Sequence, residues 1–477
     1  MHRLFYLLLL LAFACKGTFA VPNTVVKGYI KNAVAFKHEN KFHQNPVQVY
    51  HDDLLYNDVS YIEIPNDLGE FTLHIDLQKD MPFLVQYNDE MIHLFLQPND
   101  QLELYFDADN MRQTLHFDGV GAVHNNYIAQ LRRQFDFEKI TQNLHEKRGQ
   151  YSAVIYAQYC DDFSIKELLF LKNYRQKITT NSAFNEWAEA EIKYRYANKM
   201  HDYFYKTSDK KTDTYFDFIQ AHSFNNIKAL SSKQYQIFLD NHLRQLCLRD
   251  SKELRATRSL NRIPWVVRGF EIAKQQYKGL VKEYILAKLA INLMAAEYND
   301  AETYYQAFTQ INTHKAFNII VDLQYDKFKK ITSITPPTDA KLHIVAHNDS
   351  LTLQQLLAQH QGKVVYIDFW ASWCKPCLQE MKFSNELHHK YANKAVVFVY
   401  LCDDETDGQW QSNIARYQLS GEHYLMNDVL RNSVYQTLKI TNLPHYALIN
   451  KQGLVTHRNA KRPSNTALHQ DIDALLK

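Results

Sequence analysis

The chain has 477 residues, which is enough for about two to four domains of ordinary size and excludes a single small core. Its 54 basic and 52 acidic residues leave a formal charge of +2, so the charge gives no sign of a nucleic-acid-binding protein. With 46% hydrophobic and 22% charged residues the composition is globular, and six cysteines are too few for a disulfide scaffold.

The first 20 residues have the pattern of an export signal. His2 and Arg3 precede an apolar run at 4–13, which is too short to span a bilayer, and small residues follow. Cleavage after Ala20 would give a secreted protein, whereas the string ending at Cys15 resembles a lipobox, in which that cysteine is acylated. We favour cleavage after Ala20. Under either alternative we expect a protein of the periplasm or cell envelope without a later membrane-spanning helix.

Residues 21–120 alternate between apolar and polar side chains in short runs. Turn residues separate these runs, and five of the eleven prolines lie in this first quarter of the chain. This pattern predicts an all-β sandwich domain of about seven strands. The turn at Pro98-Asn99-Asp100 requires a residue that tolerates left-handed backbone geometry, which asparagine does.

Residues 121–334 change to helical spacing. Between Asn125 and Ile334 there are one proline and three glycines, and apolar residues recur every three or four positions, which predicts an all-α domain of seven to ten helices. The segment contains no metal-ligand spacing and no phosphate-binding loop. Cys160 and Cys247 are open to two interpretations, one disulfide or two buried thiols, because spacing alone does not show whether they meet.

The proline-rich joint at 335–339 begins a separate α/β domain at 335–477. Its pattern alternates strands and helices in the manner of βαβ units. We expect strands at 364–369, 395–401, 446–450 and 454–458, and helices from Cys374 onward, at 410–417 and at 466–476.

The chemistry of the sequence is concentrated in the string from Asp368 to Cys377. Cys374 and Cys377 are separated by two residues where an apolar strand ends and a helix begins, so they can close a disulfide within one turn. A thiolate at a helix N-terminus is stabilised by unpaired backbone N–H groups, and Lys375 adds a positive charge nearby. A zinc site would need a second ligand pair, which is missing at the required spacing. A purely structural disulfide would not need the acid at 368.

This string resembles the active site of the thioredoxin superfamily, and its surroundings resemble the secreted TlpA/ResA-like thiol:disulfide oxidoreductases. Glu380 matches the glutamate of that branch, whereas Lys382 stands where the branch has a proline. Residues 442–449 are similar to the strand with the cis-proline, and the resemblance covers about 140 C-terminal residues. It implies a thioredoxin-like fold for 335–477. The first two segments have a weaker similarity to the N-terminal region of envelope proteins that end in such a domain, which supports the architecture and implies no activity for these segments.

The resemblance implies dithiol–disulfide exchange on protein substrates. The Cys374 thiolate would attack a substrate disulfide, and Cys377 would resolve the mixed disulfide. Asp368, buried under the motif, would accept the proton of Cys377 through a water, unless it is only a satisfied buried carboxylate. Glu380 would share or replace this role, although its position alone fits a solvated helix residue equally well.

Other residues of the resemblance would contact the substrate. Leu443 and Pro444 would present backbone groups to an extended segment. Trp370 and Trp373 would form an apolar surface beside the nucleophile, with Trp373 the better candidate for substrate contact. We expect His445 to be merely exposed. Cys402 is better explained as a buried hydrophobic residue than as a third redox thiol.

The expected function is reduction of protein disulfides in the cell envelope, with no cofactor and no metal. In an oxidising compartment a reductase needs electrons, so we expect a thiol-reducing membrane donor as partner. Two other functions stay open. A peroxidase of the peroxiredoxin type would need a threonine three residues before its cysteine, where this chain has Ala371. A binding or scaffold protein would use the first 330 or so residues.

Overall fold

The computed structural model describes residues 23–33, 35–38, 41–44, 46–51, 55, 59–206, 222–250, 263–404 and 407–477. The predicted export signal, including Cys15, lies outside them. The chain divides into two compact units, one made of Met1–Leu246 with Tyr277–Lys282 and the other of Cys247–Gln276 with Glu283–Lys477. Within the described ranges, no helix combines the length and the apolar character needed to cross a bilayer.

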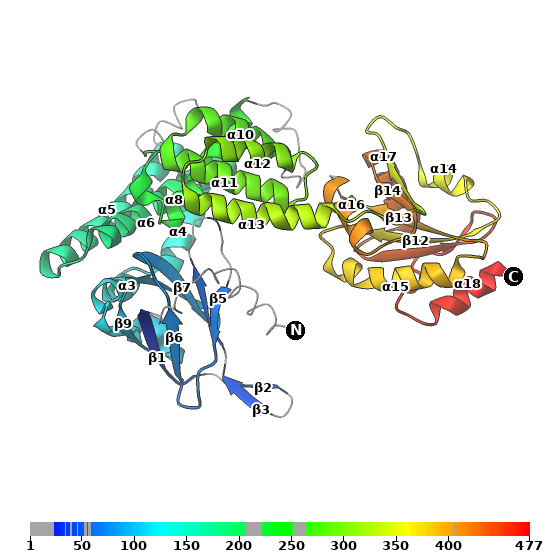
Figure 1. The fold of residues 1–477 in the computed structure, drawn as a ribbon. Coiled ribbons are helices and arrows are strands. Elements are labelled where there is room, and N and C mark those ends of the chain that lie inside the picture. Colours follow the sequence, from blue (N-terminus) through cyan, green and yellow to red (C-terminus); the bar gives the residue numbers. More distant parts are fainter. Residues whose placement is uncertain are drawn as a thin grey trace, which may run out of the picture. The chain divides into compact units, whose positions relative to one another are not determined.

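Two four-stranded sheets enclose one core at the start of the first unit (Figure 1). Inward side chains of both sheets form this core, among them Val26, Val49 and Phe83. This core confirms the prediction of an all-β part. One sheet has the order β10-β9-β1-β6, with β1 and β9 parallel, and the other has the antiparallel order β5-β4-β7-β8. The strands are β1 (Thr24–Lys31), β4 (Val47–His51), β5 (Val59–Glu63), β6 (Glu70–Ile75), β7 (Met81–Tyr87), β8 (Glu90–Leu96), β9 (Gln101–Asp107), β10 (His116–Val120) and a separate hairpin, β2 (Ala35–His38) with β3 (Lys41–Gln44). Asn99 has a φ of 72°, as its turn was expected to require.

Two consecutive asparagines attach the helices to the sheets. Asn125 accepts a hydrogen bond from the backbone N–H of Phe95 and donates one to its carbonyl, both at 2.9 Å. Asn126 makes the same pair of bonds with Phe117, at 3.0 and 2.7 Å. Each amide side chain therefore bonds both backbone groups of one strand residue, as a neighbouring strand would: Asn125 on β8 and Asn126 on β10.

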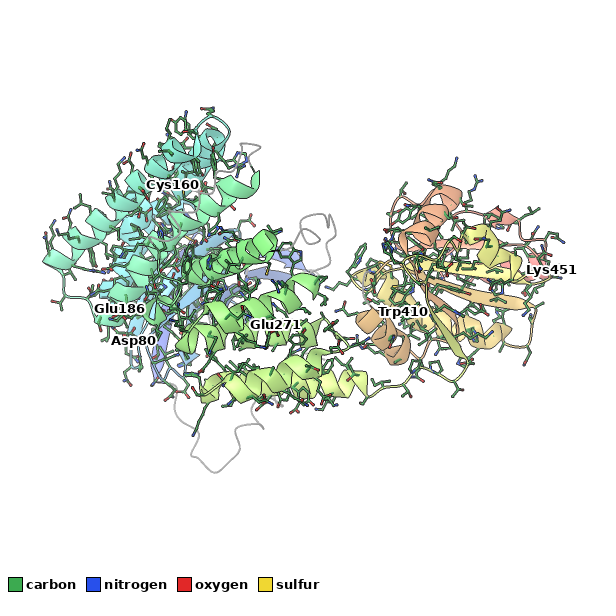
Figure 2. All side chains as sticks on the ribbon, turned by 90° about the horizontal axis from the view of Figure 1, so that it is seen from above. Asp80, Cys160, Glu186, Glu271, Trp410 and Lys451 are labelled. Carbon is green, nitrogen blue, oxygen red and sulfur yellow. A yellow bond between two sulfur atoms is a disulfide. The ribbon has the colours of Figure 1, made fainter. Side chains whose placement is uncertain are left out.

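Helices form the rest of the first unit and the start of the second, as the helical spacing predicts. They are α3 (Ala122–Gln134), α4 (Phe137–Arg148), α5 (Ala153–Lys177), α6 (Ser182–Lys206), α8 (Lys233–Asp250), α10 (Ile263–Gln276), α11 (Gly279–Ala295), α12 (Ala301–Ile311) and α13 (Lys315–Thr332), with short turns α2 (Met111–Thr114), η1 (Ala108–Asn110) and η3 (Ile227–Ala229). Pro264 lies in the first turn of α10, where no backbone N–H bond is lost. Cys160 on α5 (Figure 2) and Cys247 are buried thiols, and neither forms a disulfide.

A six-stranded sheet forms the centre of the C-terminal part, in the order β11-β14-β13-β12-β15-β16. The first four strands of this order run parallel, and the last two pairs are antiparallel. The elements are β11 (Ala340–Ile344), α14 (Leu353–Ala358), β12 (Val364–Trp370), α15 (Lys375–Tyr391), β13 (Val396–Cys402), α16 (Asp407–Arg416), β14 (Gly421–Leu425), α17 (Asp428–Leu438), β15 (His445–Ile449), β16 (Val455–His457) and α18 (Leu468–Leu476). The α/β prediction is confirmed, although it lacked β11, α14, β14 and α17.

Helices cover both faces of this sheet (Figure 1). On one face α15, α16 and α18 pack against Tyr366 and Trp370, and Trp410 of α16 lies in this core (Figure 2). On the other face α14 and α17 pack against Ile367 and Phe369. Because β12 is central and covered on both faces, all seven of its residues are buried. The domain boundaries expected at 120 and 334 stay a prediction.

Candidate active site

Cys374 and Cys377 form a disulfide where β12 passes into α15. Their Cα atoms are 5.2 Å apart, and both side chains are buried, with 5% and 2% exposed. Cys374 is the N-cap residue of α15, and its Sγ accepts a hydrogen bond from the backbone N–H of Cys377 at 3.2 Å. Pro376 fits the first turn because it has no N–H to leave unpaired. The first cysteine therefore lies where helix N–H groups stabilise a thiolate.

Asp368 is buried on the face of β12 that α15 covers. Its Oδ2 accepts a hydrogen bond from Ser384 Oγ of α15 at 3.5 Å, whereas its Oδ1 has no partner among the described residues. Burial raises the pKa of Asp368 to about 8, the hydrogen bond from Ser384 lowers it in part, and the charge of Glu380 raises it. A carboxyl with this pKa can exchange a proton near neutral pH.

Glu380 lies on α15, one turn after Cys377, and is buried rather than solvated. Both of its carboxylate oxygens accept hydrogen bonds from Ser464, one from the backbone N–H and one from the hydroxyl, each at 3.0 Å. These bonds connect the start of α15 to the segment before α18. The structure thus rejects the interpretation of Glu380 as a solvated residue.

A third buried carboxylate, that of Asp404, is bonded to the loop before Cys374. Asp404 accepts hydrogen bonds from the backbone N–H of Ser372 at 2.8 Å and from its hydroxyl. Cys402, at the end of β13, is fully buried, and burial followed by the charge of Asp404 raises the pKa of its thiol well above the usual range. This finding agrees with the expected role of Cys402 as a buried residue, while the connection between Asp404 and Ser372 is absent from the sequence prediction.

The surface beside the disulfide differs in part from the expectation. Trp373 is 68% exposed, and the Leu443–Pro444 peptide bond is cis. Leu443 packs against the core cluster that contains both cysteines. Trp370 was expected to share the surface with Trp373, but this prediction is wrong because its ring belongs to the covered face of a central strand and is fully buried. His445 was expected to be exposed and is instead buried, and its Nε2 lies 2.6 Å from the carbonyl oxygen of Arg458.

Comparison with known proteins gives matches to the C-terminal part. Residues 362–455 match a family model described as thioredoxin-like. The thiol-disulfide oxidoreductase ResA of Bacillus thuringiensis is 35% identical over 99 residues, which are 21% of this chain and 56% of that protein. ResA of Oceanobacillus iheyensis is 31% identical over 105 residues, 22% of this chain and 53% of that protein. The chain therefore spans about half the length of these relatives.

A solved structure also matches part of the chain. It is a crystal structure of a provisionally assigned thiol-disulfide oxidoreductase from Bacteroides vulgatus, with 30% identity and a TM-score of 0.23. The match covers 25% of this chain and 83% of the other protein.

Proposed function

We propose that the protein is a thiol-disulfide oxidoreductase that reduces disulfides in other proteins, and the proposal starts from the match of residues 362–455 to a thioredoxin-like family model. The observation that carries the proposal is the Cys374–Cys377 disulfide at the N-terminus of α15. Similarity to ResA of Bacillus thuringiensis supports it, because the name of that relative describes a thiol-disulfide oxidoreductase.

The first step of the proposed reaction uses the reduced dithiol. The Cys374 thiolate attacks one sulfur of a substrate disulfide, a new sulfur–sulfur bond forms, and the other substrate sulfur leaves as a thiolate that takes up a proton. The exposed ring of Trp373 and the backbone at Leu443 and Pro444 are the surfaces that we assign to the substrate segment. An extended peptide can pair with backbone groups there without a fixed sequence.

The second step releases the reduced substrate. Cys377 loses its proton and attacks Cys374 Sγ, so the mixed disulfide breaks, the second substrate thiolate leaves, and the Cys374–Cys377 disulfide forms. The substrate has then gained two electrons. We assign proton acceptance from Cys377 to Asp368, through a water, because its raised pKa lies near working pH and its Oδ1 has no other partner in the described structure.

Glu380 and Asp404 act in this proposal through other groups. The charge of Glu380 helps to keep the pKa of Asp368 high, and its bonds to Ser464 fix the start of α15. Asp404 fixes the backbone at Ser372, two residues before the nucleophile. We therefore treat both carboxylates as positioning residues and revise the assignment of Glu380 as a shared proton acceptor.

The proposed place of reaction is the cell envelope. The basic start, apolar run and small residues of 1–20 support export, with cleavage after Ala20 or acylation of Cys15 as the two ways of processing. Each turnover oxidises the cysteine pair, so continued reduction requires a thiol-reducing donor, which we place in the membrane.

Insulin reduction tests the proposal. With a dithiol donor, we expect the wild-type chain to reduce insulin and Cys374→Ser to be inactive, while Cys160→Ala, a change at a buried thiol of the other compact unit, keeps the activity. Absence of thiol-dependent activity in the wild type would contradict the proposal. Consumption of peroxide that is lost in Cys374→Ser would instead favour a peroxidase. A Cys374–Cys377 reduction potential near that of strong oxidases would contradict the reducing direction.

A further inference from the structure

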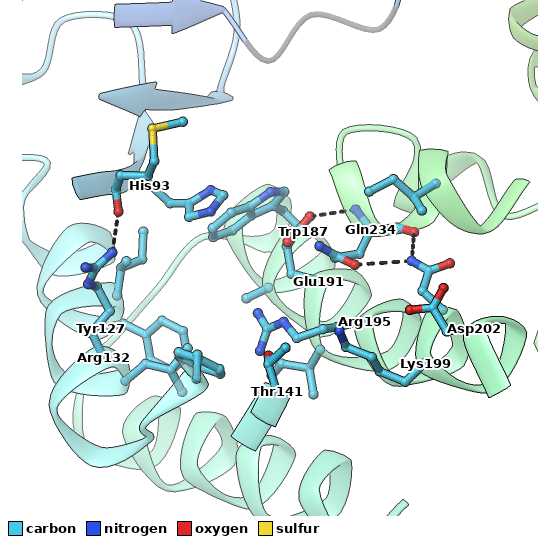
Figure 3. A pocket seen from close by; sticks show the side chains of 18 of the residues that line it. His93, Tyr127, Arg132, Thr141, Trp187, Glu191, Arg195, Lys199, Asp202 and Gln234 are labelled. Atoms are coloured by element: carbon cyan, nitrogen blue, oxygen red, sulfur yellow. Dashed lines mark hydrogen bonds between the residues drawn. The ribbon is translucent and has the colours of Figure 1, made fainter. Parts of the chain in front are cut away.

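Buried polar atoms without a hydrogen-bond partner in the described structure gather at more than one place. Two of them, the hydroxyl of Tyr127 and the indole N–H of Trp187, line a cavity of about 600 Å³ in the first unit (Figure 3). Four others lie in the C-terminal sheet, at Asp368 and on three strands to either side of it. Because most buried polar atoms of proteins have a partner, this larger group bears on the proposed proton transfer to Asp368.

The four residues form one row across the sheet. In the register of the strands, Asp368 of β12 is the direct neighbour of Tyr400 on β13 and of Tyr446 on β15. Tyr400 is in turn paired with His423 on β14, and the two rings stack with their centroids 4.5 Å apart. Residues in register on neighbouring strands point to the same face of a sheet. Tyr400 and Tyr446 accordingly belong to the core cluster that contains both cysteines.

Only the two tyrosines of this row can donate to Asp368. All four side chains are buried, and the unpartnered atoms are Oδ1 of Asp368, Nδ1 of His423 and the two tyrosine hydroxyls. Burial lowers the pKa of His423 to about 3, and its Nε2 lies 3.0 Å from the carbonyl oxygen of Leu419. The neutral imidazole therefore donates through Nε2, and its Nδ1 is an acceptor. The hydroxyls of Tyr400 and Tyr446 remain as donors.

Electrostatic effects support the closeness of these groups. The charge of Asp368 raises the pKa of Tyr400 and of Tyr446, after burial, so both hydroxyls keep their protons at neutral pH. Ser384, which donates to Oδ2 of Asp368, also lowers the pKa of Tyr400, although these two hydroxyls do not meet hydrogen-bond geometry. The titratable or charged groups of the elements packed around Asp368 are Tyr366 on β12, Tyr400 on β13, His423 on β14, Tyr446 on β15, Cys377 and Glu380 on α15, and Arg462 near Tyr446.

We propose that Tyr400 and Tyr446 are positioning residues for the proton transfer to Asp368, and that their hydroxyls donate hydrogen bonds, directly or through one bound water, to its ionised carboxylate. Hydrogen bonds of this kind stabilise the charged form of a buried carboxyl. They thus enlarge the fraction of Asp368 that can accept the proton of Cys377, while both hydroxyls keep their own protons. The role in turnover rests on the proposed oxidoreductase function, whereas the hydrogen bonds do not depend on it.

Titration of Asp368 by carbon-13 NMR tests the hydrogen bonds without a measurement of activity. The oxidised full chain carries carboxyl-labelled aspartate, and the Asp368 signal is the one that Asp368→Asn lacks. Tyr400→Phe and Tyr446→Phe should each raise the pH midpoint of this signal by about 0.5 to 1, since each removes one donor to the carboxylate. A midpoint that is unchanged or lower in either variant would overturn the assignment of that tyrosine.

Tyr366→Phe is the matched control. Tyr366 lies on the same face of β12, two residues before Asp368, but its hydroxyl already donates to the carbonyl oxygen of Lys461 at 2.9 Å. The control should therefore keep the wild-type midpoint. Circular dichroism establishes that each variant is folded. A midpoint that rises equally in Tyr366→Phe would attribute the shift to a general change of the core and contradict the proposal.

Insulin reduction measures the effect on turnover. Below the midpoint, at about pH 7, the ionised fraction of Asp368 falls about three- to tenfold in Tyr400→Phe and in Tyr446→Phe, so the resolving step should slow by the same factor and recover at higher pH. An unchanged NMR midpoint in a chain that reduces insulin would contradict this inference alone. Shifted midpoints in a chain that does not reduce insulin would confirm the hydrogen bonds and contradict the proposed function.

Discussion

Asp368 of β12 and Ser384 of α15 share one hydrogen bond, and it uses only one of the two carboxylate oxygens of Asp368. The Ser384 hydroxyl lies 3.5 Å from Oδ2, while Oδ1 is buried without a partner among the described residues. A carboxyl that is so incompletely bonded holds its proton to high pH, and burial raises its pKa to about 8. This relationship makes the proposed proton transfer testable by pH.

Asp368→Asn should slow the resolving step. The variant cannot accept the proton of Cys377, so we expect insulin reduction to fall by about a hundredfold. In the wild type the fraction of ionised Asp368 grows as the pH rises through about 8, so the rate should rise over the same range. Rates from pH 6 to pH 9 measure this, with the separately measured titration of the Cys374 thiol as control. An unchanged rate in Asp368→Asn would show that Asp368 has only a structural role.

The same residue should make the stability of the oxidised protein depend on pH. Asp368 has a folded pKa of about 8, against a model value of 3.8, so between these values the folded state holds a proton that the unfolded state has released. The contribution of Asp368 to the free energy of unfolding is therefore largest below about pH 4. It is lost as the pH rises through about 8, by up to about 1.4 kcal/mol per pH unit.

Calorimetry of the oxidised chain from pH 5 to pH 8 checks this dependence. The relevant transition is the one that shifts when the Cys374–Cys377 disulfide is reduced, and Asp368→Asn should lack the decline that the wild type has. Parallel pH curves for the two proteins would be inconsistent with a raised pKa at Asp368.

Glu380→Gln should shift the pH dependence of insulin reduction to lower pH. The charge of Glu380 raises the pKa of Asp368, so its removal makes Asp368 easier to ionise. Ser464→Ala is the matched comparison, because it keeps the Glu380 charge and removes one hydrogen bond. We expect it to cost about 1 to 3 kcal/mol of stability without moving the pH midpoint. A midpoint that stays fixed in Glu380→Gln would disprove the electrostatic role.

Trp373→Ala should weaken reduction of protein substrates while leaving the redox pair intact. Its ring is 68% exposed and free to contact a substrate, so we expect kcat/KM for insulin to fall about tenfold or more. Reduction of glutathione disulfide and the Cys374–Cys377 potential should stay near the wild-type values. Leu454→Ala removes another exposed apolar side chain, 64% exposed, and serves as control. Equal losses for insulin and glutathione disulfide would indicate a change at the cysteines instead.

The sequence allowed prediction of the site residues that are close together along the chain. The spacing of Cys374 and Cys377 and the strand-to-helix position gave the disulfide and its place at an N-cap, because both depend on a few consecutive residues. The resemblance of residues 442–449 to the family's cis-proline strand predicted the cis peptide bond between Leu443 and Pro444. The turn at Asn99 was predictable for the same local reason.

The residues that the sequence did not reveal contact the site across long separations. Ser464 is 84 positions from Glu380, and Asp404 is 32 positions from Ser372. No local pattern connects such partners, because the sheet order and helix packing decide which segments meet. Trp370 was misplaced for a related reason: one strand does not reveal that helices cover both faces of its sheet.

Trapping of the mixed disulfide tests the central assignment most directly. Cys377→Ser, reduced and then mixed with oxidised insulin, should accumulate a covalent adduct through Cys374, because the resolving thiol is absent. Intact-mass and peptide analysis identify the bonded cysteine, and Cys374→Ser treated in the same way should form little adduct. An adduct that accumulates through Cys377 in Cys374→Ser, with none in Cys377→Ser, would contradict the assignment of Cys374 as the nucleophile.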